Sequence, residues 1–379
     1  MIKLTPPMGW NSWNTFGAEI HEALIREIAD TMVTTGLREA GYEYVVLDDA
    51  WAEWERGPDG RLQANREKFP SGMKALAEDL HAKGLKFGLY SSSGHRTCLG
   101  NAASYDYEFE DAEMFAAWGV DFLKYDFCHR PETPSAAYTY RKMGAALANS
   151  GRDILFSACS WGMEETHQWI KTTGASMWRS TGDINDSWES IKDVAAAQIA
   201  LQPYNGVGCF NDMDMLVVGM NGSGNVGLNG CSYEEYKTHF SLWAFLNSPL
   251  MIGCDVRSMS EETKTILMNR EIIAINQDPA GRQPYLVGGV HSMFGTKTYC
   301  WVKLLNNGDF AVGLFNLEDV PSHLSFSAVD IGLSRVSGKK LRLTDLWTGE
   351  PVMLLGGIEV SEILQPHCCK VMRGSIAGA

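Results

Sequence analysis

Residues 1–284 alternate short apolar runs with amphipathic segments, and this alternation restricts the fold more than any other feature of the chain. Runs rich in β-branched and aromatic residues predict strands at 8–10, 44–47, 86–90, 122–125, 154–158, 177–179, 206–209 and 249–252. Segments between them, such as 20–40 and 71–83, have the spacing of amphipathic helices. Eight such units predict an α/β fold of the (β/α)8, or TIM barrel, type.

Each predicted strand runs into polar or aromatic residues at its C-terminal end. These are Asn11-Ser12-Trp13, Asp48-Asp49, the serines at 91–93, Asp126, Ser160-Trp161, Asp183, Asn211-Asp212 and Asp255. In a TIM barrel this end builds the active site. Eight unrelated solvated loops are the alternative, but a stable core does not need carboxylates at so many strand ends.

From Tyr285 onward the helical pattern stops. Short alternating runs at 298–304, 309–316, 340–345 and 367–372 are separated by turn sequences. They predict a C-terminal antiparallel β-sandwich domain. We therefore expect two domains, a catalytic barrel at residues 1–284 and an antiparallel β domain at 285–379, and we expect the second to be structural.

Charge and composition disfavour several partners. The formal net charge of −14 and the lack of a Lys/Arg-rich run disfavour nucleic acid. No stretch has the length or apolar character of a signal peptide or a membrane span, which predicts no membrane partner and a cytoplasmic location. A secreted form whose signal has been removed is the alternative. The sequence leaves open whether the chain forms a homo-oligomer.

Two carboxylates are the candidates for catalysis. Because strand side chains alternate, Lys124 and Asp126 lie on the same side, where the lysine keeps the carboxylate ionised as a nucleophile requires. A structural ion pair is the alternative. Asp183 follows the strand two positions further round and supplies a second carboxylate. Such a pair, about 5–5.5 Å apart, is what retaining glycoside hydrolysis uses.

The acidic pair Asp48-Asp49 suits either a divalent metal or sugar hydroxyls. Sugar binding is favoured because neither His95 nor His129 falls into a metal-ligand motif. Flat aromatic side chains near the strand ends suit the apolar face of a pyranose. They are Trp10, Trp13, Trp51, Trp161 and Tyr90, with Trp13 the strongest candidate.

Several motifs closely resemble glycoside hydrolase family 27, whose founding activity is α-galactosidase. They are Pro6-Pro7-Met8-Gly9-Trp10-Asn11-Ser12-Trp13-Asn14, Asp48-Asp49-Ala50-Trp51, Lys124-Tyr125-Asp126-Phe127-Cys128, and the runs at 181–188, 211–216 and 275–279. The resemblance implies a (β/α)8 barrel with a C-terminal antiparallel β domain, a retaining double displacement, no cofactor, and a small carbohydrate substrate with a terminal α-galactoside.

The resemblance also implies roles for individual residues. Asp126 is expected to be the nucleophile and Asp183 the acid/base. Asp48 and Asp49 are expected to bind the 4- and 6-hydroxyls, Lys124 the 3- and 4-hydroxyls, and Arg179 the side of the sugar that carries the 2- and 3-hydroxyls. The intact acidic pair makes the chain similar to galactosidases, so β-L-arabinopyranosidase activity ranks third.

The chain departs from the family pattern at Cys159-Ser160-Trp161. Animal and plant α-galactosidases carry a glutamate where Ser160 stands, and animal α-N-acetylgalactosaminidases pair such a serine with an alanine where this chain has Met163. Fungal-type enzymes also lack the glutamate, and they share the run from Tyr90 to Cys98. We therefore expect an α-galactosidase, with α-N-acetylgalactosaminidase as the alternative.

The resemblance further implies a disulfide beside the pocket between Cys98 and Cys128, or two thiols if the chain stays reduced. The expected substrate-binding set is Trp13, Asp48, Asp49, Tyr90, Cys98, Lys124, Cys128, Ser160, Trp161, Met163 and Arg179. A non-catalytic sugar-binding barrel is a further alternative, but it has no reason to keep both Asp126 and Asp183.

Overall fold

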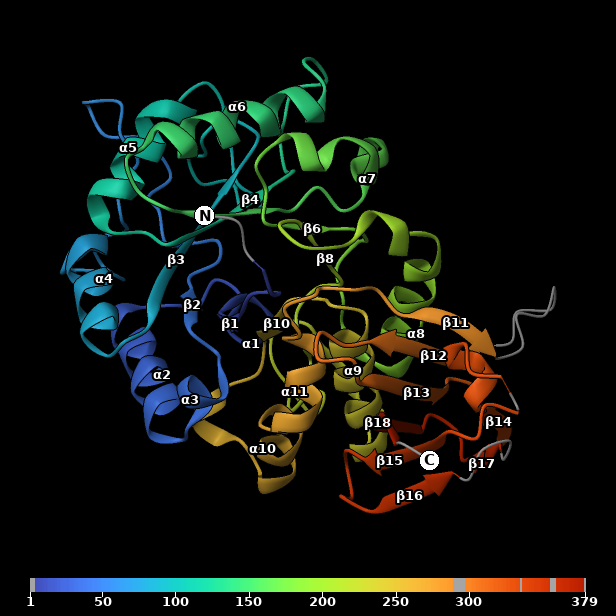
Figure 1. Cartoon of the computed structure of the whole chain (residues 1–379). Helices are drawn as coiled ribbons and strands as arrows, with labels where there is room; N and C mark the ends of the chain where they lie inside the picture. Colours follow the sequence, from blue (N-terminus) through green and yellow to red (C-terminus); the bar gives the residue numbers. More distant parts are fainter. Residues whose placement is uncertain (1–3, 289–296, 335, 355–358, 378–379) are drawn as a thin grey trace.

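A ring of parallel strands forms the centre of the N-terminal part of the molecule (Figure 1). The computed structural model describes residues 4–288, 297–334, 336–354 and 359–377. The strands are β1 (Met8–Asn11), β2 (Tyr44–Val46), β3 (Lys86–Ser92), β4 (Phe122–Asp126), β5 (Leu155–Ala158), β6 (Met177–Arg179), β8 (Phe210–Asp212) and β10 (Leu250–Ile252). Their order is β10-β1-β2-β3-β4-β5-β6-β8, and a bridge between Leu216 and Ile252 closes the ring. The predicted (β/α)8 fold is confirmed.

Helices cover the outside of the ring (Figure 1). The main ones are α2 (Glu22–Thr34), α3 (Leu37–Ala40), α4 (Gly72–Ala82), α5 (Glu108–Trp118), α6 (Ala136–Asn149), α7 (Thr166–Trp169), α8 (Trp188–Ala197), α9 (Tyr233–Phe245), α10 (Glu261–Leu267) and α11 (Arg270–Asn276). The predicted helix at 20–40 is divided in two because Gly36 adopts φ 88°, which no α-helix accommodates. Among the described residues, no helix is long and apolar enough to cross a membrane.

Strand β4 shows how the barrel places its polar residues. Phe122 points inward and joins a small apolar layer inside the ring, whereas Leu123 and Tyr125 point outward into the core beneath the helices. Lys124 and Asp126, two and four residues after Phe122, share its inward side and line a pocket. The period of two predicted from the sequence therefore holds: apolar side chains fill the lower interior, and charged ones stand above them.

The seventh strand of the barrel, β8, was predicted at residues 206–209, but these residues form the turn that precedes it. Residues 206–209 form a tight turn in which Cys209 N donates to Gly206 O at 3.1 Å, and Gly208 adopts φ 87°. The strand begins only at Phe210 because this left-handed glycine prevents an extended start. Asn211 and Asp212 consequently lie within β8, not after it.

Two antiparallel sheets form the C-terminal part, as predicted. The larger has the order β11 (Tyr285–Gly288), β12 (Thr298–Leu304), β13 (Phe310–Asn316), β18 (Cys369–Ala377), β15 (Lys340–Asp345), β16 (Pro351–Leu354), and the smaller pairs β14 (Ser322–Phe326) with β17 (Val360–Leu364). Apolar side chains such as Val302, Val312, Leu324 and Phe326 form a buried cluster between the sheets. This arrangement is a β-sandwich.

The outer face of the larger sheet packs against the barrel beside α9 and α11 (Figure 1). Trp301 of β12 stacks on Phe245 of α9, with ring centroids 6.5 Å apart. Lys303 of β12 is fully buried and donates to Ile275 O of α11 at 2.6 Å. Burial lowers the pKa of Lys303 to about 7. The two parts thus share one continuous core and a buried polar contact.

Candidate active site

A pocket of about 460 Å³ opens at the C-terminal ends of the barrel strands. Its lining consists of Trp13, Asn14, Asp48, Asp49, Tyr90, Cys98, Lys124, Asp126, Trp161, Arg179, Asp183, Asp214, Met215 and Val226. Both predicted catalytic carboxylates and most of the predicted binding residues therefore meet in one place.

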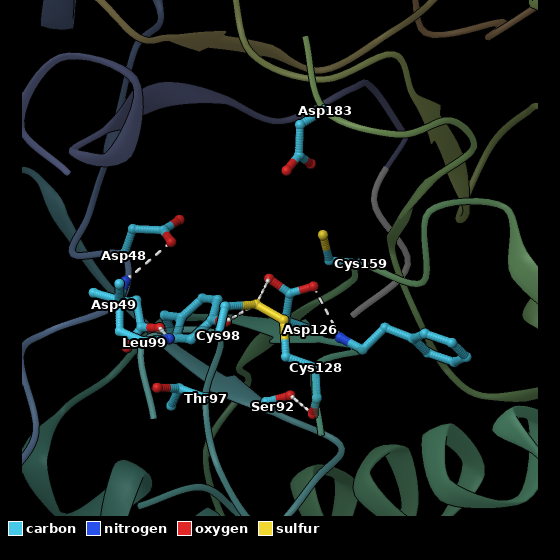
Figure 2. Close-up of a disulfide and its surroundings, with 12 residues drawn as sticks. Asp48, Asp49, Ser92, Thr97, Cys98, Leu99, Asp126, Cys128, Cys159 and Asp183 are labelled. Atoms are coloured by element: carbon cyan, nitrogen blue, oxygen red, sulfur yellow. Dashed lines mark hydrogen bonds between the residues drawn. A yellow bond between two sulfur atoms is a disulfide. The ribbon is translucent and has the colours of Figure 1, made fainter. Parts of the chain in front are cut away.

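Asp126 ends β4 and lies on the floor of the pocket, where it is buried. Phe127 N donates to its Oδ1 at 2.8 Å, and its Oδ2 lies 3.7 Å from the sulfur of Cys98 (Figure 2). Burial raises the pKa of Asp126 to about 6, against the opposing effects of the Lys124 charge and the backbone N–H. The carboxylate is rigidly held and titrates in the physiological range.

Asp183 faces Asp126 from the opposite side of the pocket (Figure 2). It lies in the loop after β6, its side chain is 66% exposed, and its Oδ1 accepts from Arg179 at 2.9 Å. Partial burial raises the pKa of Asp183, but the positive charges of Arg179 and Lys124 outweigh this effect and set the pKa below its usual value. The two carboxylates thus have different environments: one on the floor, one at the rim.

The acidic pair Asp48-Asp49 forms a side wall. Asp48 Oδ2 accepts from Lys124 Nζ at 2.7 Å and from Asn11 Nδ2 at 2.8 Å. Asp49 accepts from the backbone N–H groups of Ala50 at 2.7 Å and Leu99 at 2.9 Å. Burial raises the pKa of Asp49 despite these bonds. Because fixed donors orient both carboxylates, their remaining lone pairs are available to hydroxyl groups of a ligand.

Asp214 is the most informative residue that the sequence prediction missed. It is buried, and its Oδ2 lies 2.9 Å from Arg179 Nη2 and 2.8 Å from Ile184 N, next to Asp183 in the chain. One carboxylate therefore holds both the arginine and the loop that carries Asp183. Asp214 stood in the motif at 211–216, and its φ of 76° turns the chain so that its side chain returns to the pocket.

The other lining residues not predicted are Asn14, Met215 and Val226. Val226 belongs to a glycine-rich segment, and its N–H donates to Asn14 O at 3.0 Å. This bond holds the segment against the residues that follow β1. Sequence spacing offers no signal for it, because the two residues are far apart in the chain.

A disulfide joins Cys98 to Cys128 beside Asp126, as the family resemblance implied (Figure 2). The bridge links the loop after β3 to the residues that follow β4. Leu99, next to Cys98 in that loop, donates to Asp49, so the same loop also contacts the acidic pair. Gly94 passes so close that a Cβ there would lie 2.2 Å from Cys128 O. The described residues include one group of potential metal ligands, Cys98, Asp126 and Cys128, but metals bind thiolate sulfur and these two sulfurs are bonded to each other.

Three predicted binding residues do not line the pocket. Cys128 contributes through its bridge to Cys98. Ser160 is buried with its Oγ 2.7 Å from Thr166 Oγ1, and Met163 is 52% exposed on the outer surface. The chain adopts left-handed φ values at Trp161 (55°) and Gly162 (76°), so Trp161 faces the pocket while its neighbours turn away.

Among the predicted aromatic platforms, Trp10 and Trp51 belong to the core. Trp10 Nε1 donates to Cys254 O at 2.9 Å, and Trp51 Nε1 donates to Tyr90 O at 2.8 Å. Both rings are almost fully buried. Trp13, Tyr90 and Trp161 remain as aromatic walls of the pocket.

Comparison with known proteins gives a consistent result along the chain. Residues 5–278 match the family described as alpha galactosidase A, and residues 295–373 match the alpha galactosidase C-terminal beta sandwich domain. The α-galactosidase of Cyamopsis tetragonoloba is 44% identical over 97% of this chain and 85% of its own length. The crystal structure of α-galactosidase I from Mortierella vinacea is similar, with 32% sequence identity and a TM-score of 0.88, and the match covers 98% of this chain and 97% of that one. A structure of the Saccharomyces cerevisiae α-galactosidase with raffinose is also similar, with 28% identity and a TM-score of 0.86 over 99% of this chain and 98% of that one.

The contacts of Arg179 predict unequal roles in stability for its two carboxylate partners. Asp214→Asn leaves the buried guanidinium with the exposed Asp183 as its one ion-pair partner among the described residues, so we expect the free energy of unfolding to fall by about 3 kcal/mol in urea denaturation. Asparagine keeps the size of the side chain and tolerates the left-handed φ. Asp183→Asn removes the exposed partner of the same arginine and is expected to cost under about 1 kcal/mol. Equal losses in the two variants would contradict the idea that Asp214 compensates the charge of Arg179.

Proposed function

The chain belongs to the α-galactosidase A family of glycoside hydrolases, and on this premise we propose that it is a retaining exo-glycosidase that hydrolyses terminal α-linked D-galactose. The observation that carries the proposal is the pair Asp126 and Asp183, which project from opposite sides into one pocket walled by Asp48 and Asp49. Two facing carboxylates are the apparatus of a double displacement. Relatives along almost the whole chain are α-galactosidases.

The difference in exposure supports the assignment of roles. In a pocket that takes the terminal sugar, the leaving group faces the opening, so the carboxyl group at the rim protonates it and the carboxylate on the floor attacks from the other side. Asp126 Oδ bonds to the anomeric carbon as the glycosidic C–O bond breaks and Asp183 transfers its proton to the leaving oxygen. Asp183 then accepts a proton from water, whose oxygen displaces Asp126 and regenerates the free carboxylate.

The acidic wall supports recognition of galactose. We propose that Asp48 and Asp49 accept hydrogen bonds from the 4- and 6-hydroxyls and that Lys124 donates to the 3- and 4-hydroxyls, with Arg179 on the 2-hydroxyl side. Each of these groups is buried or nearly so, and a sugar that leaves one of them unpaired loses binding energy. The axial 4-hydroxyl separates galactose from glucose in this way.

The segment after β5 favours galactose over N-acetylgalactosamine. Ser160, the residue that suggested the alternative substrate, bonds to Thr166, and the residue presented to the pocket is Trp161. An indole ring leaves less room for a 2-acetamido group than a serine would. The galactoside is therefore the substrate that the site supports best.

A direct comparison of two substrates tests the proposed function. The wild-type protein is expected to cleave p-nitrophenyl α-D-galactopyranoside with a kcat/KM at least about tenfold above that for the matching α-N-acetylgalactosaminide, because Trp161 crowds the acetamido group. Release of p-nitrophenol measures both rates. A faster N-acetyl substrate would reverse the assignment, and cleavage of neither would remove the proposed activity.

Azide distinguishes the two carboxylates by the product formed. Asp126→Ala and Asp183→Ala are each expected to lose roughly a thousandfold or more in kcat. With azide, Asp126→Ala should yield the β-galactosyl azide by direct displacement, and Asp183→Ala the α-galactosyl azide through the covalent intermediate. The anomeric proton coupling in the NMR spectrum identifies each product. Exchanged products would mean that the roles are reversed.

The pKa values predict an acidic optimum. Catalysis needs one proton on the pair, with Asp183 protonated and Asp126 ionised. Burial raises the pKa of Asp126 to about 6, whereas the charges of Arg179 and Lys124 lower the pKa of Asp183, so above pH 6 the free enzyme loses the last proton held by these two carboxyl groups. We expect kcat/KM for melibiose, whose sugar leaving group needs protonation, to fall as the pH rises from 6 to 8.

The Asp183→Ala variant serves as the control for this profile. With p-nitrophenyl α-D-galactopyranoside, which has a good leaving group, its rate should show no decline of this kind, since no acid is left to titrate. A wild-type rate for melibiose that increases between pH 6 and 8 would contradict the assignment of the acid.

A further inference from the structure

Asp186, three residues after Asp183, is a completely buried carboxylate with no part in the chemistry described above. It begins the short strand β7 (Asp186–Ser187), which pairs with β9 (Gly227–Gly230) of the glycine-rich segment. Burying a carboxylate is costly unless hydrogen-bond donors compensate it. The groups that donate to Asp186 therefore show which segments of the chain it connects.

Two donors from different segments meet at the Asp186 carboxylate. Gly222 N donates to Oδ2 at 2.7 Å, and the Tyr236 hydroxyl donates to Oδ1 at 2.9 Å. The same hydroxyl accepts a hydrogen bond from Asn221 N at 2.8 Å. Asp186, Tyr236 and the backbone of residues 221–222 thus form a closed set of hydrogen bonds, which we call the Asp186 network.

Tyr236 connects the Asp186 network to the interior of the protein. It lies near the start of α9, a helix that begins with a capping box of Ser232 and Glu235 and whose residues from Tyr236 to Phe245 are almost all buried. At the other end of α9, Phe245 stacks on Trp301 of the sandwich. A helix held at both ends is a rigid base, so the network anchors surface segments to the core.

On one side the Asp186 network holds the loop that carries Asp183. The Asp183 side chain is mostly exposed, so its own packing contributes little to fixing its place. Its position depends on the residues that follow it in the chain. Asp214 binds the backbone N–H of Ile184, one residue after Asp183, and the network fixes Asp186, two residues further on.

On the other side the Asp186 network holds the glycine-rich segment at 219–230. Asp186 N donates to Val226 O at 3.0 Å, and Val226 lines the same pocket as Asp183. Ordering a segment so rich in glycine is costly in backbone entropy, so contacts from outside are needed to fix it. The network therefore sets the place of a pocket wall as well as that of the loop with Asp183.

Proton transfer makes the position of Asp183 decisive. The acid must lie within about 2.6–3.2 Å of the glycosidic oxygen, and a displacement of about 1 Å can reduce the rate a hundredfold. We propose that Asp186 and Tyr236 are positioning residues that hold Asp183 where it acts as acid and then as base. This inference rests on the proposed function and adds to it two residues that do not line the pocket.

Two substrates that differ only in a nitro group separate the position of the acid from the stability of the fold. Phenyl α-D-galactopyranoside has a basic leaving group and needs the proton of Asp183, whereas p-nitrophenyl α-D-galactopyranoside releases an anion that is stable without it. In Tyr236→Phe, we expect kcat/KM for the phenyl substrate to fall about tenfold and kcat/KM for the p-nitrophenyl substrate to fall less than about threefold.

The second chemical step gives an independent readout. Hydrolysis of the covalent intermediate needs Asp183 as base whichever group has left, so a displaced Asp183 slows this step for both substrates. The intermediate then accumulates with the p-nitrophenyl substrate, and kcat and KM should fall together. A fold that is only loosened would instead lower kcat at constant KM, because less of the protein is active.

Two substitutions of Asp186 grade the effect. Asp186→Asn keeps an oxygen that can accept from Gly222 N, whereas Asp186→Ala removes both acceptor oxygens. We therefore expect the ratio of kcat/KM for the p-nitrophenyl substrate to that for the phenyl substrate to rise more in Asp186→Ala than in Asp186→Asn. If Asp186→Ala does not fold, Tyr236→Phe decides, since it removes a single hydroxyl group.

The chain offers matched controls for the loss of a buried hydroxyl and of a buried carboxylate. Tyr42 is buried, and its hydroxyl donates to Leu267 O at 2.7 Å. Asp345 of the sandwich is buried and accepts from Trp347 N at 2.8 Å. Neither residue lines the pocket, so Tyr42→Phe and Asp345→Asn should keep the wild-type ratio.

Each outcome decides between the possibilities. A ratio that rises in Tyr236→Phe and stays constant in the two controls supports the proposal. Equal losses of kcat/KM for both substrates in Tyr236→Phe, or an unchanged ratio, overturn it and leave the proposed function intact, because the wild-type protein still cleaves both. A wild-type protein that cleaves neither substrate overturns the proposed function and this inference together.

Discussion

The site depends on an imbalance of buried charge at one end of the barrel. Five buried carboxylates, those of Asp48, Asp49, Asp126, Asp212 and Asp214, lie in or just beneath the pocket with two cations, Lys124 and Arg179, and the exposed Asp183 stands at the rim. Two cations do not neutralise five carboxylates in a low-dielectric environment, so burial raises the pKa of Asp126 and of Asp212 to about 6. The same imbalance that costs stability leaves a carboxyl group able to gain and lose a proton near neutral pH.

Much of this site follows from the sequence because a barrel converts strand order into position. Lys124 and Asp126 alternate with outward residues on β4, and Asp48, Asp49 and Asp183 lie in the loops that follow their strands. Periodicity and strand ends were therefore enough to bring them together. The sandwich domain was equally predictable, since its strands alternate and are separated by turn sequences. Local pattern fixes these features.

The features that the sequence analysis placed wrongly or did not find share a different cause. Asp214, Trp161 and Gly208 each adopt a left-handed φ, and such a residue redirects the chain in a way that no periodicity predicts. For this reason Asp214 was not recognised as lining the pocket, Ser160 and Met163 were expected in it, and the seventh strand was placed too early. The pairing of Asn14 with Val226 is a tertiary contact between distant segments and leaves no local trace.

Arg179 has one permanent and one removable partner, and this difference bears on how a single carboxyl group acts as acid and then as base. Asp214 is buried and tied to the backbone, so it compensates the arginine at every stage, whereas Asp183 is exposed and can separate from it. A substrate that draws Asp183 away from Arg179 removes the interaction that lowers its pKa, which favours the protonated acid. Once Asp126 forms the covalent ester its negative charge is gone, so the pKa of Asp183 falls again and the group becomes a base toward water. The fixed pair of Arg179 and Asp214 allows this cycle, because no step leaves the buried guanidinium without a counter-charge.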